Sequence, residues 1–110
     1  MSKNKVSLAE VMKRLPTPEG KQSVSLFTHG TLEVKMYAPR GRDPQMPHKR
    51  DEVYLVAQGH GTYLCAGQRE PFSPGDFLFA AAGVEHRFED FSDDFFTWVL
   101  FYGPEGGEEE

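Results

Sequence analysis

Two histidines and a glutamate are the residues of this sequence whose types and spacing could hold a metal ion. His48 and Glu52 flank the entry to a strand-like segment, and His86 lies near the start of a later one. Two imidazoles and one carboxylate that converge on a cavity form a ligand set that divalent metals accept, with coordination positions left open for substrate or oxygen. Spacing alone does not establish convergence, so the prediction depends on the elements that carry these residues.

The two segments that carry the candidate ligands have a similar layout. Side chains two positions apart on a strand share a face, so Glu52 and Tyr54 should point the same way. The later segment runs from Gly75 through a strand to a tight turn at Gly83, and then into a strand that begins near His86. Both segments therefore predict a strand with a candidate ligand close to its start.

The rest of the chain predicts one short helix followed by strands. Ser7 and Glu10 have the spacing of a capping box, and apolar residues at positions 8, 11, 12 and 15 recur at helical intervals until Pro16. Beyond Gln22 the period is two: apolar positions 32, 34 and 36 alternate with polar positions 31, 33 and 35, which predicts a strand with one buried face. Turn signals then recur about every eight to twelve residues, a spacing typical of an all-β sandwich or barrel.

Length, composition and charge indicate one folded domain that does not bind nucleic acid. The chain has 110 residues, of which 38% are hydrophobic and 13% aromatic, as in globular proteins. The formal net charge is −5, but four of the 17 acidic residues fall in the last six, which leaves 13 acidic residues against 12 basic ones. Because no basic stripe stands out, nucleic acid is not an expected partner.

Cysteine usage and hydropathy predict a cytoplasmic protein without a membrane segment. Cys65 is the only cysteine, so neither an intrachain disulfide nor a thiolate metal cluster can form. The N-terminus lacks a secretory signal pattern, and no segment approaches the roughly 20 apolar residues of a membrane span. A reducing compartment fits these features.

The pattern along the chain predicts three parts. Residues 1–20 form an N-terminal helical lead-in, residues 21–103 form the β-barrel, and residues 104–110, rich in Pro, Gly and Glu, form an acidic flexible tail. The run from Phe95 to Tyr102 is apolar on both strand faces, so it is either covered on both sides or contacts another subunit. We therefore expect a homodimer.

Residues 40 to 90 resemble the cupin family, whose first motif can be followed along this chain. His48, Glu52 and Gly59 match the spacing of that motif's second histidine, glutamate and closing glycine. Met46 stands where the family has its first histidine, and Gly41 is one place away from the motif's leading glycine. The loop before the site is therefore expected to differ from the family pattern.

The second cupin motif also matches, and the distance between the motifs is short. Gly75, Gly83 and His86 match its two glycines and its histidine, while Ala81 replaces the usual proline. Fifteen residues separate Gly59 from Gly75, a spacing similar to that of compact bacterial members. Together, the two motifs are more specific than three isolated candidate ligands.

This resemblance implies both a fold and a ligand set. The implied fold is an all-β double-stranded β-helix, the cupin or jelly-roll barrel, with one short N-terminal helix. The implied cofactor is a divalent metal ion, Fe, Mn, Ni or Zn, held by His48, Glu52 and His86. The fourth position stays open between a water, the Gln45 amide oxygen and the Met46 thioether, the last of which suits copper(I) better than these ions.

The resemblance further implies a small metal-binding cupin that acts on, or binds, a small organic molecule. Dioxygenase-like, isomerase and lyase reactions are all compatible with it, and Tyr54 is the only obvious inward hydroxyl that could serve as acid or base. Phe88 shares a face with His86, which makes it a candidate pocket residue. The alternative is a non-catalytic ligand-binding or sensing module with a degenerate or empty metal site, a hypothesis that Met46 favours.

Overall fold

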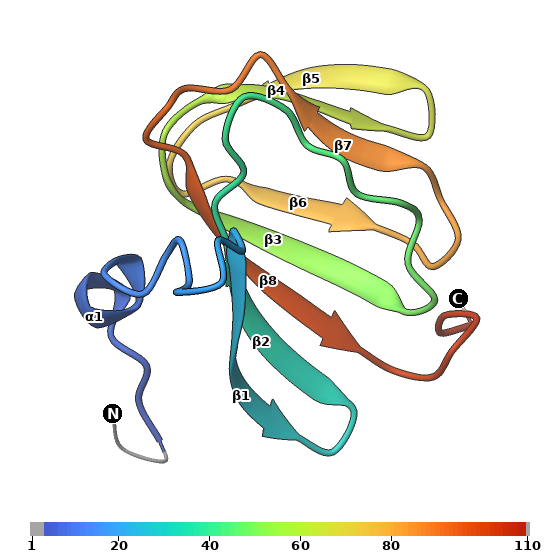
Figure 1. The fold of residues 1–110 in the computed structure, drawn as a ribbon. Coiled ribbons are helices and arrows are strands. Elements are labelled where there is room, and N and C mark those ends of the chain that lie inside the picture. The colour runs from blue at the N-terminus through green and yellow to red at the C-terminus, as the bar shows by residue number, and fades with distance from the viewer. Residues whose placement is uncertain (1–3, 110) are drawn as a thin grey trace.

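The computed structural model describes residues 4–109, which form a barrel of two antiparallel sheets preceded by a short helix (Figure 1). The predicted all-β cupin barrel with one N-terminal helix is thereby confirmed. In the described part of the chain, no helix has the length and apolar content needed to cross a membrane. The elements are α1 (Leu8–Met12), β1 (Ser23–His29), β2 (Leu32–Tyr37), β3 (Asp51–Gln58), β4 (Gly61–Cys65), β5 (Gln68–Phe72), β6 (Phe77–Ala80), β7 (His86–Glu89) and β8 (Phe96–Tyr102).

The two sheets have different widths. Its strand order is β1-β2-β8-β3-β6, whereas the smaller sheet has the order β5-β4-β7. All neighbouring strands are antiparallel, so paired residues project to the same side. The segment between β2 and β3 crosses from the larger sheet towards β7, and the backbone N–H of Phe88 donates to the Asp43 carboxylate there (Figure 1).

Aromatic side chains fill the space between the sheets. Phe88 of β7 lies at the centre, with ring centroids 4.8 Å from those of Tyr54 and Phe95 and 5.4 Å from those of Tyr63 and Phe72. All five residues are buried. Edge-to-face and tilted arrangements of this kind are favourable aromatic contacts.

The helix α1 covers part of the outer face of the larger sheet. Ser7 caps it by accepting a hydrogen bond from the backbone N–H of Glu10 at 3.5 Å, as the capping box predicts. The helix ends at Met12, because the chain turns before the predicted stop at Pro16. Fully buried Val11 packs in an outer cluster with Met36 and other apolar side chains of the sheet.

The strand β2 is covered on both faces, so the prediction of one buried face was incomplete. Met36 is fully buried on the outer side, under α1. Lys35 lies on the opposite side, where it pairs with Val99, and Val99 in turn pairs with Tyr54 of the aromatic core. The polar set of positions on β2 therefore faces the barrel interior.

The last strand is likewise covered on both sides, as its apolar pattern allowed. Phe96 is 7% exposed and packs in the outer cluster with α1, whereas Val99 is 4% exposed and packs in the inner core. Trp98 packs on the outer cluster. The apolar run of β8 is thus accounted for within one chain.

The segment after β8, the predicted acidic tail, forms hydrogen bonds with the barrel. The backbone N–H of Gly106 donates to the Lys49 carbonyl at 2.7 Å, and that of Glu108 donates to the Asp51 carboxylate at 2.8 Å. Glycine permits this close return of the chain, since a Cβ at Gly107 would lie 2.9 Å from an Asp51 oxygen. Residues 1–3 of the predicted lead-in and Glu110 of the predicted tail lie outside the described residues.

Candidate metal centre

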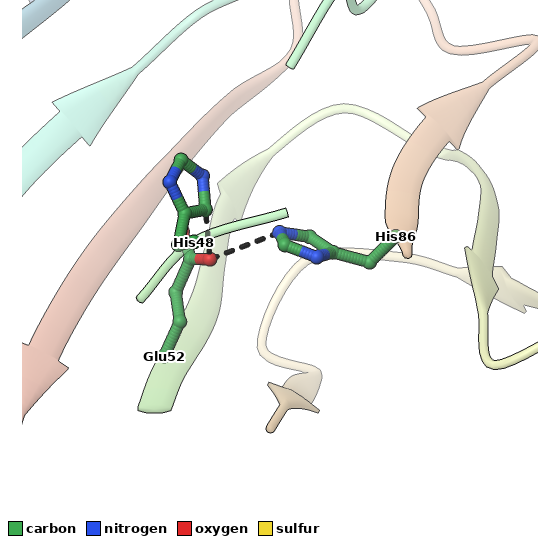
Figure 2. Close-up of side chains that lie close together, drawn as sticks. All are labelled: His48, Glu52 and His86. Atoms are coloured by element: carbon green, nitrogen blue, oxygen red, sulfur yellow. Dashed lines mark ion pairs between the residues drawn. The ribbon is translucent and has the colours of Figure 1, made fainter. Parts of the chain in front are cut away.

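The three predicted ligands meet at one end of the barrel (Figure 2). His48 comes from the loop before β3, Glu52 from the start of β3 and His86 from the first residue of β7. One ligand atom from each lies within 4.8 Å of the others, and the two imidazole centroids are 5.3 Å apart. Packing of the two sheets therefore brings together Glu52 and His86, which are 34 positions apart in sequence.

Glu52 and His86 form the buried part of this group. Both are 2% exposed, and the Glu52 Oε1 atom lies 2.9 Å from His86 Nε2. Neither atom has a partner in hydrogen-bond geometry among the described residues. A buried carboxylate without a satisfying donor is costly, and a cation at this point would satisfy both atoms.

The other nitrogen of His86 fixes the orientation of its ring. His86 Nδ1 lies 2.9 Å from the Val84 carbonyl oxygen, which can only accept, so Nδ1 must carry the proton and donate. In the neutral ring Nε2 then presents its lone pair to the centre, the arrangement typical of metal-bound histidine. Burial lowers the pKa of His86, but the Glu52 carboxylate and the Val84 carbonyl outweigh it, and the pKa ends above its ordinary value. Without a cation, a protonated Nε2 therefore pairs with Glu52, and a bound metal would displace that proton to reach the lone pair.

His48 is the more accessible member of the group. Its Nε2 lies 3.7 Å from Glu52 Oε1 and 3.1 Å from the Gln45 amide oxygen. Burial lowers the pKa of the His48 imidazole below its ordinary value, Glu52 opposes this effect, and the charges of His86 and Lys35 add to it. A lowered pKa favours the neutral imidazole, which is the form that binds metals.

Gln45, and not Met46, lies beside the three candidate ligands. The Gln45 nitrogen donates to Asp43 Oδ2 at 2.6 Å, so its oxygen faces the centre, 3.1 Å from His48 Nε2 and from the Tyr54 hydroxyl. Met46 is 73% exposed, which contradicts its thioether as a ligand. These adjacent side chains thus lie on opposite sides of the loop, Gln45 towards the centre and Met46 towards solvent.

Tyr54 faces the group but is fully buried behind it. Its hydroxyl donates to the Gln45 oxygen, and burial followed by the Glu52 charge raises the pKa of the phenol well above its ordinary value. A phenolate is therefore disfavoured, so the chemistry of this hydroxyl is that of a hydrogen-bond donor and not of a base. Tyr54 does not line the cavity described next.

A cavity of about 200 Å³ adjoins the group on the side of β1, β2 and β8. Phe88, the predicted pocket residue, is not part of its lining, because the side chain lies deeper, in the aromatic core. Lys35 is a lining residue that the sequence analysis missed, although its shared parity with Tyr37 places both on one face. The lining residues are Ser23, Lys35, Tyr37, Pro44, Gln45, His48, Glu52, Val99 and Phe101.

Comparisons with known protein sequences identify a family match and two kinds of relative. The profile of the cupin domain family matches residues 33–102. An uncharacterized protein of Streptomyces coelicolor is 35% identical over 63 residues, which cover 57% of this chain and 60% of that protein. The HTH-type transcriptional activator RhaS of Yersinia pestis is 28% identical over 85 residues, or 76% of this chain and 31% of RhaS. The chain thus spans less than two thirds of either relative.

Solved structures share the same fold at low sequence identity. A cupin-2 domain containing protein from Shewanella frigidimarina has a TM-score of 0.70 at 14% identity, over 89% of this chain and 94% of that one. A protein from Neisseria meningitidis has a TM-score of 0.71 at 14% identity, over 90% and 99%. KdgF from a Halomonas species has a TM-score of 0.64 at 20% identity, over 73% and 76%. At these identities the similarity concerns the fold alone.

Proposed function

This chain belongs to the cupin family, and from that premise we propose that it is a metal-binding cupin that holds a small organic molecule beside its ion. His48, Glu52 and His86 would hold a divalent metal, Fe, Mn, Ni or Zn. The organic molecule would occupy the adjoining cavity of about 200 Å³. Fold alone does not fix function, so the proposal rests on the site.

The proposal depends on the two buried ligand atoms of the candidate metal centre, one from Glu52 and one from His86. Glu52 Oε1 and His86 Nε2 are buried, 2.9 Å apart, and without a hydrogen-bond partner of good geometry. Two such atoms are ligand types for borderline divalent metals. The hydrogen bond from His86 Nδ1 to the Val84 carbonyl supports the same reading, because it holds the ring with Nε2 facing the centre.

The chain's own residues would position the ion and the organic ligand. Asp43 orients the Gln45 amide so that its oxygen faces the centre as a candidate fourth ligand, with a water as the alternative. The Tyr54 hydroxyl donates a hydrogen bond to the same Gln45 oxygen from the side of the aromatic core. A bound divalent ion would supply Lewis-acid activation of a ligand atom at an open position, which is compatible with dioxygenase-like, isomerase and lyase reactions.

Metal analysis with one substitution tests the proposal. The purified chain is stripped with a chelator and titrated with Mn²⁺, Ni²⁺ and Zn²⁺ by calorimetry, and bound metal is counted by mass spectrometry. We expect one ion per chain, and we expect His86→Ala to abolish stoichiometric binding. The control is His60→Ala, at an exposed histidine outside the group. Equal occupancy in His86→Ala and His60→Ala would exclude this site.

A non-catalytic binding or sensing module is the second candidate function. It is favoured by the departure from the family motif at Met46, which is exposed and offers no ligand to the centre. The similarity to RhaS, an HTH-type transcriptional activator of which this chain covers 31%, also supports it. Absence of binding to Mn²⁺, Ni²⁺ and Zn²⁺, together with binding of small molecules, would favour this second candidate function.

We also propose that two copies of the chain associate through the outer face of β3 and β6. Leu55, Phe77 and Phe79 are 39%, 63% and 43% exposed on that face, and they form what we call the outer patch. Phe77 pairs with Leu55 across the two strands, so the side chains are neighbours. The β6 strand is also an edge of the larger sheet.

A further inference from the structure

Lys35 brings a positive charge to the cavity beside the candidate metal centre. It projects from the inner face of β2 and pairs in register with Val99 of β8. His48 and Glu52 of the candidate metal centre line the same cavity. The Lys35 side chain and the candidate metal centre therefore line one cavity.

No acidic side chain of residues 4–109 forms an ion pair with Lys35. Glu33, two positions earlier on the same face, is engaged by Arg50 at 3.5 Å and by the Ser25 hydroxyl at 3.2 Å. Glu52, the carboxylate of the cavity, lies against His86. Lys35 is half-buried, and an ammonium that lacks a counter-charge on such a residue creates a favourable place for an anion.

The remaining walls of the cavity are mostly apolar. Val99 and Phe101 form the side along β8, and Pro44 lies on the loop opposite. The Tyr37 hydroxyl already donates to Asp43, so its proton is not available to a ligand carboxylate. The volume of about 200 Å³ is below the roughly 300–1,000 Å³ usual for drug-sized ligands, which limits the occupant to a small molecule.

We propose that the cavity binds a small organic acid whose carboxylate pairs with Lys35. Its apolar body packs against Val99 and Phe101, and its other end reaches towards His48 and Glu52. A single ammonium balances the single charge of a carboxylate, whereas a phosphate monoester carries about −1.5 to −2 charges at pH 7. The inference rests on the proposed function for the end near the candidate metal centre, whereas the contact with Lys35 needs no metal.

Calorimetry with matched acids and amides tests the inference. The probes are phenylacetate and 4-methylpentanoate, each compared with its neutral amide, in low-chloride buffer and with inorganic phosphate as a competitor. The full chain is used in two preparations, one loaded with Zn²⁺ and one stripped by a chelator. We expect each acid to bind at least about tenfold more tightly than its amide, a difference of about 1.4 kcal/mol, and phosphate not to displace it.

Substitutions at Lys35 separate the ammonium from the rest of the cavity. Lys35→Met and Lys35→Gln should remove the preference for the acid, while Lys35→Arg should keep it. Lys13→Met is the matched control, because Lys13 is 74% exposed beside α1 and does not line the cavity. Circular dichroism checks that each variant folds. Two neutral substitutions are used so that a structural defect specific to Met or to Gln at position 35 is not mistaken for the loss of the charge.

The outcomes distinguish this inference from the proposed function. An acid preference that is absent in the wild type, or that survives in both Lys35→Met and Lys35→Gln, overturns the inference even if metal binds. Displacement of the acids by phosphate overturns the assignment to a carboxylate. A chain that binds no metal but prefers acids through Lys35 contradicts the proposed function and supports the contact inferred here.

Discussion

Asp43 is a buried carboxylate that holds the loop before β3 against the barrel. It is 8% exposed and accepts hydrogen bonds from the Tyr37 hydroxyl, the Gln45 side chain and the Phe88 backbone N–H. These contacts join β2, the loop and β7. The segment that carries His48 is therefore positioned by a residue that does not itself belong to the candidate ligand group.

Replacing Asp43 should destabilise the fold and loosen the site together. In Asp43→Ala, four donors lose their acceptor: the Tyr37 hydroxyl, the Phe88 backbone N–H, and the backbone and side-chain N–H groups of Gln45. Each such loss costs about 1–3 kcal/mol where the donor is buried, so we expect the free energy of unfolding to fall by about 3 kcal/mol or more. Metal affinity should fall about 10–100-fold, as when residues that orient ligands are lost. Urea denaturation and metal titration measure the two effects. Asp93→Ala, at an exposed carboxylate, is the control, and equal stability of the two variants would contradict the assigned role.

Single residues differ in how far the sequence could identify them. The candidate ligands His48, Glu52 and His86 could be proposed because their spacing matches two motifs, and the structure brings them together. The choice between Gln45 and Met46 could not be made, because adjacent residues in a loop follow no fixed period. Only the backbone path, together with the hydrogen bond from Gln45 to Asp43, selects between them.

At the scale of elements, alternation along a strand identifies two sets of side chains without telling which set faces the interior. On β2 the apolar set with Met36 is covered by α1, and the polar set with Lys35 faces the cavity. Alternation on β2 predicts burial of the apolar set alone, because it contains no information on which face α1 covers. The sequence could thus predict the strand and its two-residue alternation. That Lys35 faces the cavity could be known only from the packing of α1 on the other face.

Gly59 could be identified from the sequence by its place in the first cupin motif. The structure explains why this position needs a glycine. Its φ of +92° lies in the region that favours glycine. A Cβ there would lie 2.7 Å from Phe95 Cα, so the turn after β3 packs directly on the backbone that enters β8. Family spacing could locate this glycine, whereas its contact with Phe95 depends on the closed barrel.

Asp51 joins two segments near the candidate centre, the turn after β6 and the segment after β8. One carboxylate oxygen accepts from the Ala82 N–H at 2.9 Å and the other from the Glu108 N–H at 2.8 Å. These hydrogen bonds lower the pKa of the Asp51 carboxyl below its ordinary value. The residue next to Glu52 therefore ties the chain end to the turn that leads towards His86.

The contribution of Asp51 should depend on pH in a defined direction. Because its pKa is lower in the folded state, its contribution is present above the pKa of the unfolded chain, about 3.9, and is lost as the pH falls through the folded value. We expect Asp51→Asn to be less stable than the wild type at pH 6 and the difference to shrink below about pH 4. Urea denaturation across pH measures it, and hydrogen exchange at Ala82 and Glu108 should quicken in the variant. A difference that stays constant between pH 6 and pH 2.5 would contradict this account.

At the scale of the whole molecule, the outer patch is the part of the larger sheet that α1 leaves uncovered. The helix packs over Met36 and Phe96, whereas Leu55, Phe77 and Phe79 remain exposed beyond it. Aromatic side chains are enriched at protein interfaces, and clustered exposed apolar residues commonly mark them. A second copy presents the same patch, so a two-fold contact would bury both at once. The body of the chain is also close to neutral, which limits electrostatic repulsion between copies.

Disrupting the outer patch should therefore shift the chain from dimer to monomer. In the double variant Phe77→Ser, Phe79→Ser, each lost aromatic contact should cost about 2 kcal/mol if it lies at the centre of the interface, which weakens dimerisation about 30-fold or more per residue. Analytical ultracentrifugation over a range of concentrations measures the change. Met46→Ser is the matched control, because Met46 is an apolar residue exposed to 73% outside the outer patch. A wild-type chain that stays monomeric at high concentration, or a dimer that both sets of substitutions leave unchanged, would show that this face is not the contact between copies.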